Sequence, residues 1–371
     1  MLVSETHFTN KSHFSMPNYM FYHTNHPDET AHGGSAIIIK TQIKHHAAEE
    51  YRQEYLQATT VVIDDWTGPL AVSAIYCPPK HAIDHTLFES FFSQLGHRFL
   101  SGGDWNAKHP WWGSRLRIPT PRGRQLYEAI KKYNCFTIST GEPTYWPSNP
   151  RKSPDLIDFA IARGIHKNKN ITARTSLDLS SDHSPVIITI DAPLKTTLRT
   201  RTKICWAKFK EIVPEKISCG VSICTVDDLE NRIESFNAML QSAVSAASTT
   251  TVLSHCHRKV SNQIEDKIRE KRRLRKIWQS TRNAYTKRKL NKAINDLKAL
   301  LLEEKNNDIA SYLQKLTPTE ANDYSLWKAT KRINRPQNYI APIRKNSGDW
   351  ARTDHDKGLA FALHLSSVFK P

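Results

Sequence analysis

Polar side chains of the kinds used in acid–base and metal chemistry follow four apolar runs in the first half of the chain. Such positions matter because sites are commonly built where a strand gives way to a loop. Each residue alone is more often structural, since an Asp beside a His usually belongs to a turn and a Tyr before Pro-Pro usually packs. Their joint occurrence in order, each at the end of a strand-like run, favours one shared site. The residues are Tyr76 in "SAIYCPP", Asp104 and Asn106 in "GGDWNAKH", Asp158 in "PDLIDFAI", and Asp182 and His183 in "LSSDHSPV".

The most crowded of these segments is "GGDWNAKHPWWGS", residues 102–114, with a carboxylate, an amide, a lysine, a histidine and three tryptophans. Two glycines stop an apolar run directly before Asp104. A surface turn capped by Asp and Asn is the simpler interpretation of such a segment. We expect Trp111 and Trp112 to buttress the loop rather than stack on a base, because large aromatic side chains beside a turn more often pack.

The elements that must position these residues are short strands. Residues 1–191 alternate β-like runs with turns, and helical spacing of apolar residues is clearest in residues 86–95 and 122–134. This pattern predicts an α/β domain with a sheet-rich core. The β-like runs are "GGSAIIIK", "TVVIDDW", "LAVSAIYCPP", "HRFLSGGDWN", "NCFTIST", "DLIDFAIAR" and "SPVIITIDAP".

After residue 191 the sequence becomes helical and basic. Thr225 with Asp228 predicts a capping box at the start of an amphipathic helix. Residues 258–292 contain 14 Lys and Arg against three acidic residues. A solvated helix face explains many such runs, and a phosphate-contacting arm is the alternative. On the second interpretation, the candidate nucleic-acid contacts here are Arg272, Arg273 and Arg275.

Composition limits the classes of function. The chain has 371 residues and a formal net charge of +17, which favours a polyanionic partner, with nucleic acid the first candidate. No stretch is long and apolar enough for a membrane span, and the first residues do not look like a signal peptide. We therefore expect a protein inside the cell without a membrane partner. The six cysteines lack the spacing of a disulfide framework or a zinc module.

Five motifs, which occur in a fixed order in the first 191 residues, resemble those of a known superfamily. "SETH", "IYCPP", "GGDWNAKHPWWGS", "LIDFAI" and "SSDHSPV" together resemble the endonuclease/exonuclease/phosphatase superfamily, and more narrowly the apurinic-type endonuclease domain of jockey-type non-LTR retrotransposons. The resemblance implies an α/β (α+β) fold, a four-layered two-sheet β-sandwich flanked by helices. It also implies a Mg²⁺-dependent phosphodiesterase, with Mn²⁺ as a possible substitute, that nicks double-stranded DNA to prime reverse transcription in the nucleus.

The resemblance assigns roles residue by residue. Glu5 in "SETH" would bind the metal, with Asp104 and Asp182 assisting. Asp104 would also orient or deprotonate the attacking water, while Asn106 and Tyr76 would contact the scissile phosphate. His183, oriented by Asp158, would stabilise developing negative charge. In this interpretation, further contacts to the DNA backbone come from Lys108, His109 and Arg115.

The resemblance also bears on domain organisation. The strand and asparagine that open this superfamily find no counterpart before Glu5, so we expect an N-terminally truncated domain over residues 1–191. Residues 192–371 resemble the segment that joins such a domain to its reverse transcriptase, a mostly helical basic linker that ends before the polymerase. The element's RNA is a further possible partner. Two alternatives stay open: a catalytically inactive nucleic-acid-binding remnant, and a hydrolase of phosphoinositides or sphingomyelin from the same superfamily.

Overall fold

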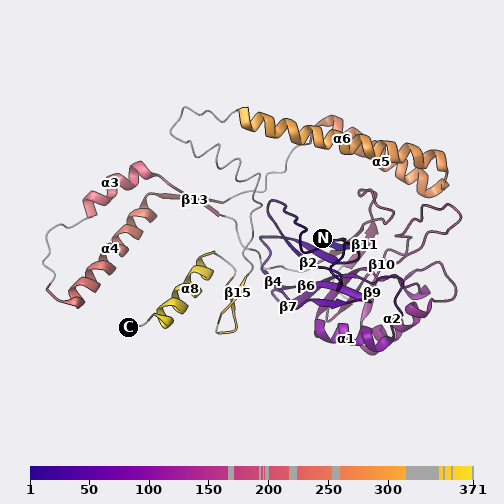
Figure 1. Cartoon of the computed structure of the whole chain (residues 1–371), viewed down its shortest axis with the longest axis horizontal. Coiled ribbons are helices and arrows are strands. Elements are labelled where there is room, and N and C mark those ends of the chain that lie inside the picture. Colours follow the sequence, from indigo (N-terminus) through magenta and orange to yellow (C-terminus); the bar gives the residue numbers. More distant parts are fainter. Residues whose placement is uncertain are drawn as a thin grey trace. The chain divides into compact units, whose positions relative to one another are not determined.

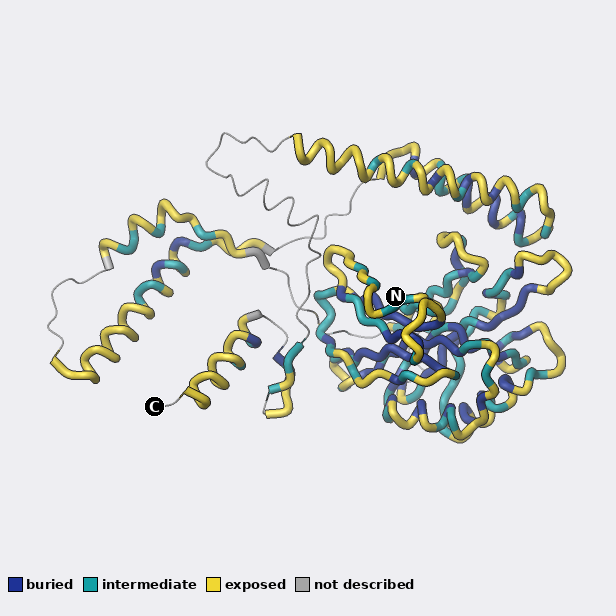
Figure 2. Tube along the Cα trace, in the orientation of Figure 1, coloured by how far each residue is buried: buried dark blue, intermediate teal, exposed yellow. Residues whose placement is uncertain are grey.

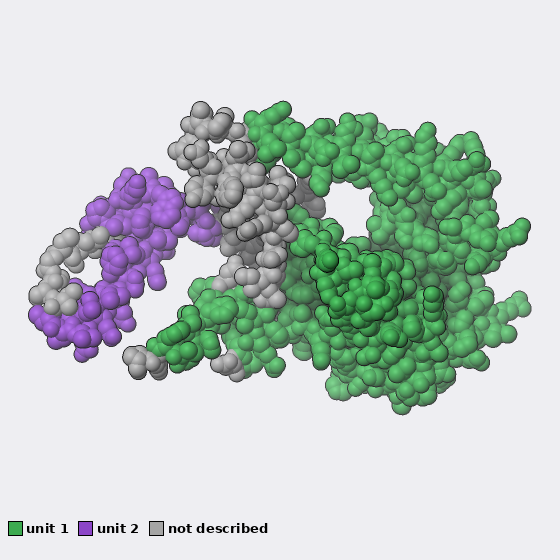
Figure 3. Space-filling model, viewed as in Figure 1, with its two compact units in different colours: residues 1–195, 259–371 green, residues 196–258 purple. Residues whose placement is uncertain are grey.

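The computed structural model places most of the chain in two compact units. Unit 1 comprises residues 1–195 and 259–371, and unit 2 comprises residues 196–258 (Figure 3). The boundary expected at residue 191 remains a prediction. The structure describes the whole chain except residues 166–170, 192, 193, 195, 197–199, 217–223, 253–259, 315–341, 346, 352, 353, 370 and 371.

Unit 1 contains a seven-stranded sheet in the order β4-β6-β7-β8-β10-β9, with β5 also paired to β6. A three-stranded sheet has the order β1-β3-β2, and β11 pairs with β12. Every β-like run expected from the sequence contains a strand. The bounds are β1 Leu2–Ser4, β2 Tyr19–Thr24, β3 Ser35–Lys40, β4 His45–Ala47, β5 Tyr51–Gln53, β6 Leu56–Asp65, β7 Gly68–Tyr76, β8 Phe99–Asp104, β9 Phe136–Ile138, β10 Asp158–Arg163, β11 Ile171–Thr175 and β12 Val186–Ile190.

Two helices cover one face of the seven-stranded sheet (Figure 1). Helix α1 (His85–Leu95) begins after Asp84, whose side chain accepts the backbone N–H of Leu87. Helix α2 (Pro121–Lys132) begins after Thr120, which caps Gly123 in the same way. Phenylalanines of α1 pack with the fully buried Trp105 on this face. The two helices predicted from the apolar spacing are thus confirmed.

The small sheets cover the opposite face. Ile37 and Ile39 of β3 pack against Val61 and Ile63 of β6. The β11–β12 pair contributes to a neighbouring cluster with β10 and β9. Buried backbone is concentrated in this two-sheet core (Figure 2). The predicted two-sheet sandwich with flanking helices is therefore present.

Aromatic side chains from the segment between β1 and β2 pack on the three-stranded sheet. Phe8 and Phe14, from the segment between β1 and β2, pack against Phe21 of β2 at ring distances of 5.5 and 5.1 Å. Aromatic side chains of this loop thus cover part of β2.

The remainder of unit 1 is mainly helical. Helix α5 (Asn262–Thr281) and helix α6 (Ala284–Gln314) form a pair joined by a short turn at Arg282 (Figure 1). A short hairpin, β15 (Ile343–Arg344) with β16 (Trp350–Ala351), precedes helix α8 (Asp354–Val368). The linker motif "LWKATKRINRP", residues 326–336, lies outside the described residues. Among the helices of the described part, none is both long and apolar enough to cross a membrane.

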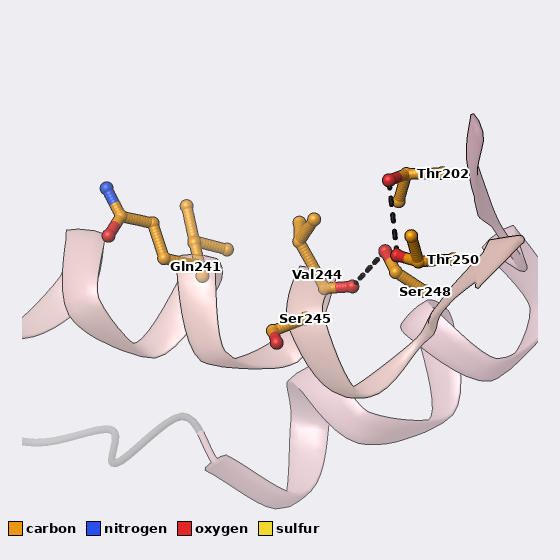
Figure 4. Close-up of a pocket in the computed structure, with 7 residues that line it drawn as sticks. Thr202, Gln241, Val244, Ser245, Ser248 and Thr250 are labelled. Atoms are coloured by element: carbon orange, nitrogen blue, oxygen red, sulfur yellow. Dashed lines mark hydrogen bonds between the residues drawn. The ribbon is translucent and has the colours of Figure 1, made fainter. Parts of the chain in front are cut away.

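Unit 2 contains helix α3 (Trp206–Lys216), helix α4 (Val226–Ala246) and the pair β13 (Thr200–Ile204) with β14 (Ser248–Val252). The predicted capping box is present, since Thr225 and Asp228 cap each other at the start of α4. A pocket lies between α4 and the strand pair, where Ser248 donates a hydrogen bond to the carbonyl of Val244 (Figure 4). Its lining is Thr202, Leu240, Gln241, Val244, Ser245, Ser248 and Thr250, which includes no acid–base side chain.

Candidate active site

Three strands bring three of the predicted residues to one edge of the seven-stranded sheet. Tyr76 is the last residue of β7 and pairs in parallel register with Asp104, the last residue of β8. Asp158 is the first residue of the antiparallel strand β10 and pairs with Asp104 from the other side. The register therefore places a phenol and two carboxylates side by side from three separate parts of the chain.

The glycine before Asp104 allows the strands to approach this closely. Gly103 has a φ of 153°, and a Cβ there would lie 2.1 Å from the carbonyl oxygen of Ile75 and 2.8 Å from Ser4 Oγ. Ser4 Oγ donates to the Ile75 carbonyl at 2.7 Å and accepts the backbone N–H of Asp104 at 3.0 Å. Ser4 thus fixes the end of β8 to β7, and Gly103 leaves the space for it.

Asp104 is held by the residue two positions later. The backbone N–H of Asn106 donates to Asp104 Oδ1 at 2.9 Å, and its Nδ2 donates to Oδ2 at 2.8 Å and to the Cys77 carbonyl at 3.1 Å. Asn106 adopts a φ of 45°, which asparagine tolerates. Burial, followed by the charge of Asp158, raises the pKa of the Asp104 carboxyl well above its ordinary value. In this structure Asn106 orients Asp104, and its contact with a phosphate stays a prediction.

His183 and Asp158 form a hydrogen-bonded pair. His183 Nδ1 lies 2.8 Å from Asp158 Oδ2, and the ring packs against Tyr145 at 4.9 Å. Burial alone would lower the pKa of His183, but the hydrogen bond and charge of Asp158, with the charges of Asp104 and Asp182, raise it to about 9. The imidazole is thus held protonated near neutral pH with Nε2 left for another partner.

Glu5 and Tyr76 form a second pair at this edge. Tyr76 Oη donates to Glu5 Oε1 at 3.0 Å. Burial and the charge of Glu5 raise the pKa of Tyr76, so that the phenol remains a donor. Glu5 has a φ of 59°, a left-handed conformation that is uncommon outside glycine and asparagine, and its N–H bonds to the Gly34 carbonyl at 2.8 Å. Backbone strain of this kind often accompanies function.

The donor set suits a divalent cation. One ligand atom each from Asp104, Asp158 and His183 lies within 4.8 Å of the others, and the charge of Glu5 acts on Asp104. Burial contributes most to the raised pKa of Asp104, and the charge of Asp158 adds to it; a cation beside Asp104 would favour the charged carboxylate. Carboxylate oxygens are the ligands that Mg²⁺ prefers. Because Asp158 is committed to His183, Asp104 is the better placed ligand of this group, and the metal-ligand role expected for Glu5, which lies outside the group, stays a prediction.

Asp182 lies outside this group of ligand atoms in the described residues. It is exposed, Ser181 Oγ donates to its carboxylate at 3.3 Å, and its carbonyl accepts the N–H of Trp146. The metal-ligand role expected for Asp182 is therefore not supported by its placement. Its charge still raises the pKa of His183.

The loop after Asp104 uses its polar side chains internally. Lys108 Nζ lies 3.3 Å from the buried carboxylate of Asp155, which also accepts from the Ser114 hydroxyl. His109 accepts the N–H of Trp111 through Nδ1 and stacks on Tyr127 with ring centroids 4.5 Å apart. Burial lowers the pKa of His109, which disfavours a cationic phosphate contact. The predicted DNA contacts of Lys108 and His109 are thus replaced by structural ones.

The two tryptophans of this loop differ. Trp112 is buried, donates from Nε1 to the Ala107 carbonyl at 3.2 Å and stacks on Phe159 at 4.8 Å, as the buttress interpretation predicts. Trp111 is 63 % exposed and touches Tyr127 only edge-on. The buttress prediction therefore describes Trp112, whereas Trp111 presents its ring to solvent.

The four arginines predicted to contact nucleic acid differ in exposure and in their partners. Arg115 and Arg273 are exposed and open to a polyanion. Arg272 is exposed but bonds to the carboxylate of Asp178. Arg275 is only 3 % exposed and donates to three backbone carbonyls, so the phosphate contact expected of it is wrong for this structure. A charge run in a sequence does not tell which of its members face the protein.

Several residues that organise the site carry no individual signal in the sequence. Thr144 Oγ1 accepts the N–H of Asp158 at 3.0 Å, and its carbonyl accepts the N–H of Ser184. The Asp155 carboxylate accepts from the Ser114 hydroxyl and from the N–H groups of Arg115 and Leu156, and it pairs with Lys108. Thr144 follows a proline turn in "GEPTYW" and Asp155 precedes a strand, so each resembles an ordinary turn residue.

The sequence is similar to proteins of retrotransposons. Residues 70–187 match the family model described as "Endonuclease-reverse transcriptase". The whole chain aligns at 30 % identity with 41 % of the RNA-directed DNA polymerase from mobile element jockey of Drosophila funebris, and at 32 % with 41 % of the Drosophila melanogaster protein of that name. The chain thus spans about two fifths of the length of these curated relatives.

Several solved structures align with about half of the chain. The endonuclease domain of TRAS1, a telomere-specific non-LTR retrotransposon, covers 47 % of this chain and 81 % of its own at 19 % identity, with a TM-score of 0.38. The Xenopus laevis APE2 catalytic domain covers 49 % of this chain and 79 % of its own at 14 % identity, with a TM-score of 0.39. By sequence, the chain is thus similar to the endonuclease-reverse transcriptase family over residues 70–187, and over its whole length to about two fifths of the jockey RNA-directed DNA polymerases.

Proposed function

We propose that the site nicks one strand of double-stranded DNA by divalent-metal-dependent hydrolysis. The observation that carries the proposal is the convergence of Asp104, the His183–Asp158 pair and the Glu5–Tyr76 pair at one sheet edge. This set includes a buried base, a protonated imidazole, a phenolic donor and carboxylates for a cation. These are the parts that hydrolysis of a phosphodiester requires.

The residues divide the chemistry as follows. Asp104 takes a proton from the attacking water, whose oxygen bonds to phosphorus as the P–O3′ bond breaks. The 3′ oxygen leaves and takes up a proton from solvent, which gives a 3′-hydroxyl and a 5′-phosphate. His183 donates to a nonbridging oxygen, where charge develops, and the Tyr76 hydroxyl turns from Glu5 to donate to another. Mg²⁺, or Mn²⁺ in its place, held by Glu5 and Asp104, would supply Lewis-acid stabilisation of that charge.

The charge of the chain supports DNA as the substrate. A net charge of +17 favours a polyanion, and Arg115 and Arg273 are exposed to meet one. Arg273 lines a groove between α5 and α6 with Lys289 and Lys292, which provides a second basic surface for DNA or for the element's RNA. We place this activity in the nucleus, where the 3′-hydroxyl of chromosomal DNA would prime reverse transcription in the intact polyprotein.

Nicking of supercoiled plasmid by the purified chain in Mg²⁺ tests the proposal. We expect open-circular product that a DNA polymerase extends without prior phosphatase treatment, because the nick ends in a 3′-hydroxyl. EDTA and the variant His183→Ala should each abolish the product. If the folded chain shifts DNA in a gel yet leaves the plasmid intact, the inactive-remnant alternative holds instead.

A further inference from the structure

Helix α5 contacts the loop that carries His183, a contact that the proposed chemistry does not use. The loop joins β11 to β12 over residues 176–185, and its middle is exposed, with Leu179 46 % exposed. Few apolar side chains anchor it. A histidine that must meet a phosphate at hydrogen-bond distance needs a fixed backbone. One side of this loop is bonded to residues 144–146 through the bridge of His183 to Tyr145 and the N–H of Ser184, and α5 contacts the other part.

Arg275 supplies several bonds to this loop. Its Nη1 donates to the Leu179 carbonyl, and its Nη2 donates to the carbonyls of Ser181 at 3.0 Å and His183 at 2.9 Å. One planar guanidinium therefore holds three carbonyls of the same loop, including that of His183 itself. The fixed fork of donors on arginine makes such an arrangement possible, and the single ammonium of lysine does not reproduce it.

Neighbouring residues of α5 extend the contact along the loop. Lys271 Nζ donates to the Asp178 carbonyl, and Arg272 Nε donates to its carboxylate at 2.6 Å. Gln279 Nε2 donates to Ser184 Oγ at 3.1 Å. Lys271 and Arg275 are both about 5 % exposed or less, so these cations are committed to the protein rather than to solvent.

Trp146 and Trp278 of α5 also contribute to the packing of this helix beside the loop. Trp146 packs near Trp278 of α5 with ring centroids 6.3 Å apart, in a cluster with Leu274 and Leu290. The backbone N–H of Trp146 donates to the Asp182 carbonyl at 2.9 Å. The loop is thus bonded to Trp146 and to α5, which also contact each other.

We propose that α5 is a brace for the catalytic loop and that Arg275 is a positioning residue, which acts on the reaction by fixing the backbone of His183. The inference rests on the proposed nuclease function. It assigns part of the basic segment a role other than nucleic-acid binding. It also makes turnover depend on a helix that lies about 90 residues beyond His183 in the sequence.

The test compares Arg275→Lys with Lys276→Ala in the full chain. Arg275→Lys keeps the charge but loses the fork, whereas Lys276→Ala removes an exposed charge from the adjacent position. We expect Arg275→Lys to lower kcat for nicking about 10- to 100-fold with KM for DNA within about twofold. Lys276→Ala should leave kcat unchanged.

Hydrogen–deuterium exchange of the peptide covering residues 176–184 provides a readout that does not need activity. We expect faster exchange there in Arg275→Lys and a smaller increase in Gln279→Leu, which loses only the bond to Ser184. Unchanged exchange, or an unchanged kcat in an active Arg275→Lys, would overturn the brace. If the wild-type chain does not nick DNA, but exchange in residues 176–184 is faster in Arg275→Lys, the proposed function is wrong. The contact between α5 and the loop would still be supported.

Discussion

Asp158 Oδ2 lies 2.8 Å from Nδ1 of His183, across the 25 residues that separate them in the sequence. Asp158 is fixed by its place at the start of β10, and His183 sits on the loop between β11 and β12. The rigid partner therefore fixes the orientation of the imidazolium ring, and its Nε2–H is left to donate to a substrate oxygen.

Substitution of Asp158 by Asn should shift the pH dependence of nicking. Burial opposes the charge on His183, and loss of the Asp158 carboxylate removes the main interaction that raises its pKa to about 9. The imidazolium is present below the pKa, so wild-type kcat should fall only as pH rises through about 9. In Asp158→Asn that fall should move toward pH 6.5, and kcat at pH 8 should drop about 10- to 100-fold. Profiles of kcat from pH 6 to 10 measure it, and identical alkaline limbs would exclude this role.

Tyr76→Phe should lower nicking without unfolding the chain. The phenol donates to Glu5 at 3.0 Å, and its raised pKa keeps it protonated throughout the working range. Loss of one donor to developing charge costs about 100-fold in kcat in comparable sites. The free energy of unfolding in urea should change by only about 1 kcal/mol. An unchanged kcat in the folded variant would remove Tyr76 from the mechanism.

Glu5→Gln should raise the Mg²⁺ concentration required for half-maximal nicking. A carboxylate is lost from the proposed ligand pair, while the neutral amide still accepts from Tyr76. We expect an increase of about tenfold or more, with activity partly restored at saturating Mg²⁺. Glu29→Gln, at another residue with a positive φ, is the matched control. Equal Mg²⁺ titrations for both variants would argue against Glu5 as a ligand.

The salt bridge between Asp65 and Arg98 should make the stability of the sandwich depend on pH. Burial opposes the charge on Asp65, but hydrogen bonds from Arg98 and Thr67 lower its pKa from 3.8 to about 2. Because the folded pKa lies below the unfolded one, the stabilisation is complete above about pH 4 and is lost as pH falls through 2. Asp65→Asn should therefore cost about 2 kcal/mol at pH 7 and less at pH 3. Urea unfolding of the wild type and of Asp65→Asn at pH 7 and at pH 3 measures the loss in free energy of unfolding. An equal loss at the two pH values would contradict the prediction.

The positions of Tyr76 and Asp104 at strand ends could be predicted from the sequence, because the end of an apolar run can be recognised there. Tyr76 and Asp104 each close an apolar run, and parallel neighbours put such ends together. Asp158 opens its strand and meets Asp104 only through antiparallel pairing, which the pattern alone does not specify. The family resemblance supplied that relationship.

The sequence was less informative about charged side chains outside the strands. From the sequence, Lys108 and Arg275 are predicted to be free cations. In the structure, Lys108 pairs with the buried carboxylate of Asp155, and Arg275 donates to carbonyls of the loop that carries His183. Their partners lie 47 and 92 residues away, and tertiary packing decides which side of a basic helix faces the protein. For the same reason, nothing in "GEPTYW" marks Thr144 as a bridge between the two halves of the site.

The most direct test is single-turnover cleavage of a labelled duplex in Mg²⁺ by wild type, Asp104→Asn and Asp84→Asn. Asp84 caps α1, a role that asparagine also fills, so this variant controls for loss of an aspartate elsewhere in the domain. The account predicts cleavage by wild type and Asp84→Asn, with a loss of at least about 1,000-fold in Asp104→Asn despite equal DNA binding. Equal cleavage by Asp104→Asn would show that the reaction does not occur at this sheet edge.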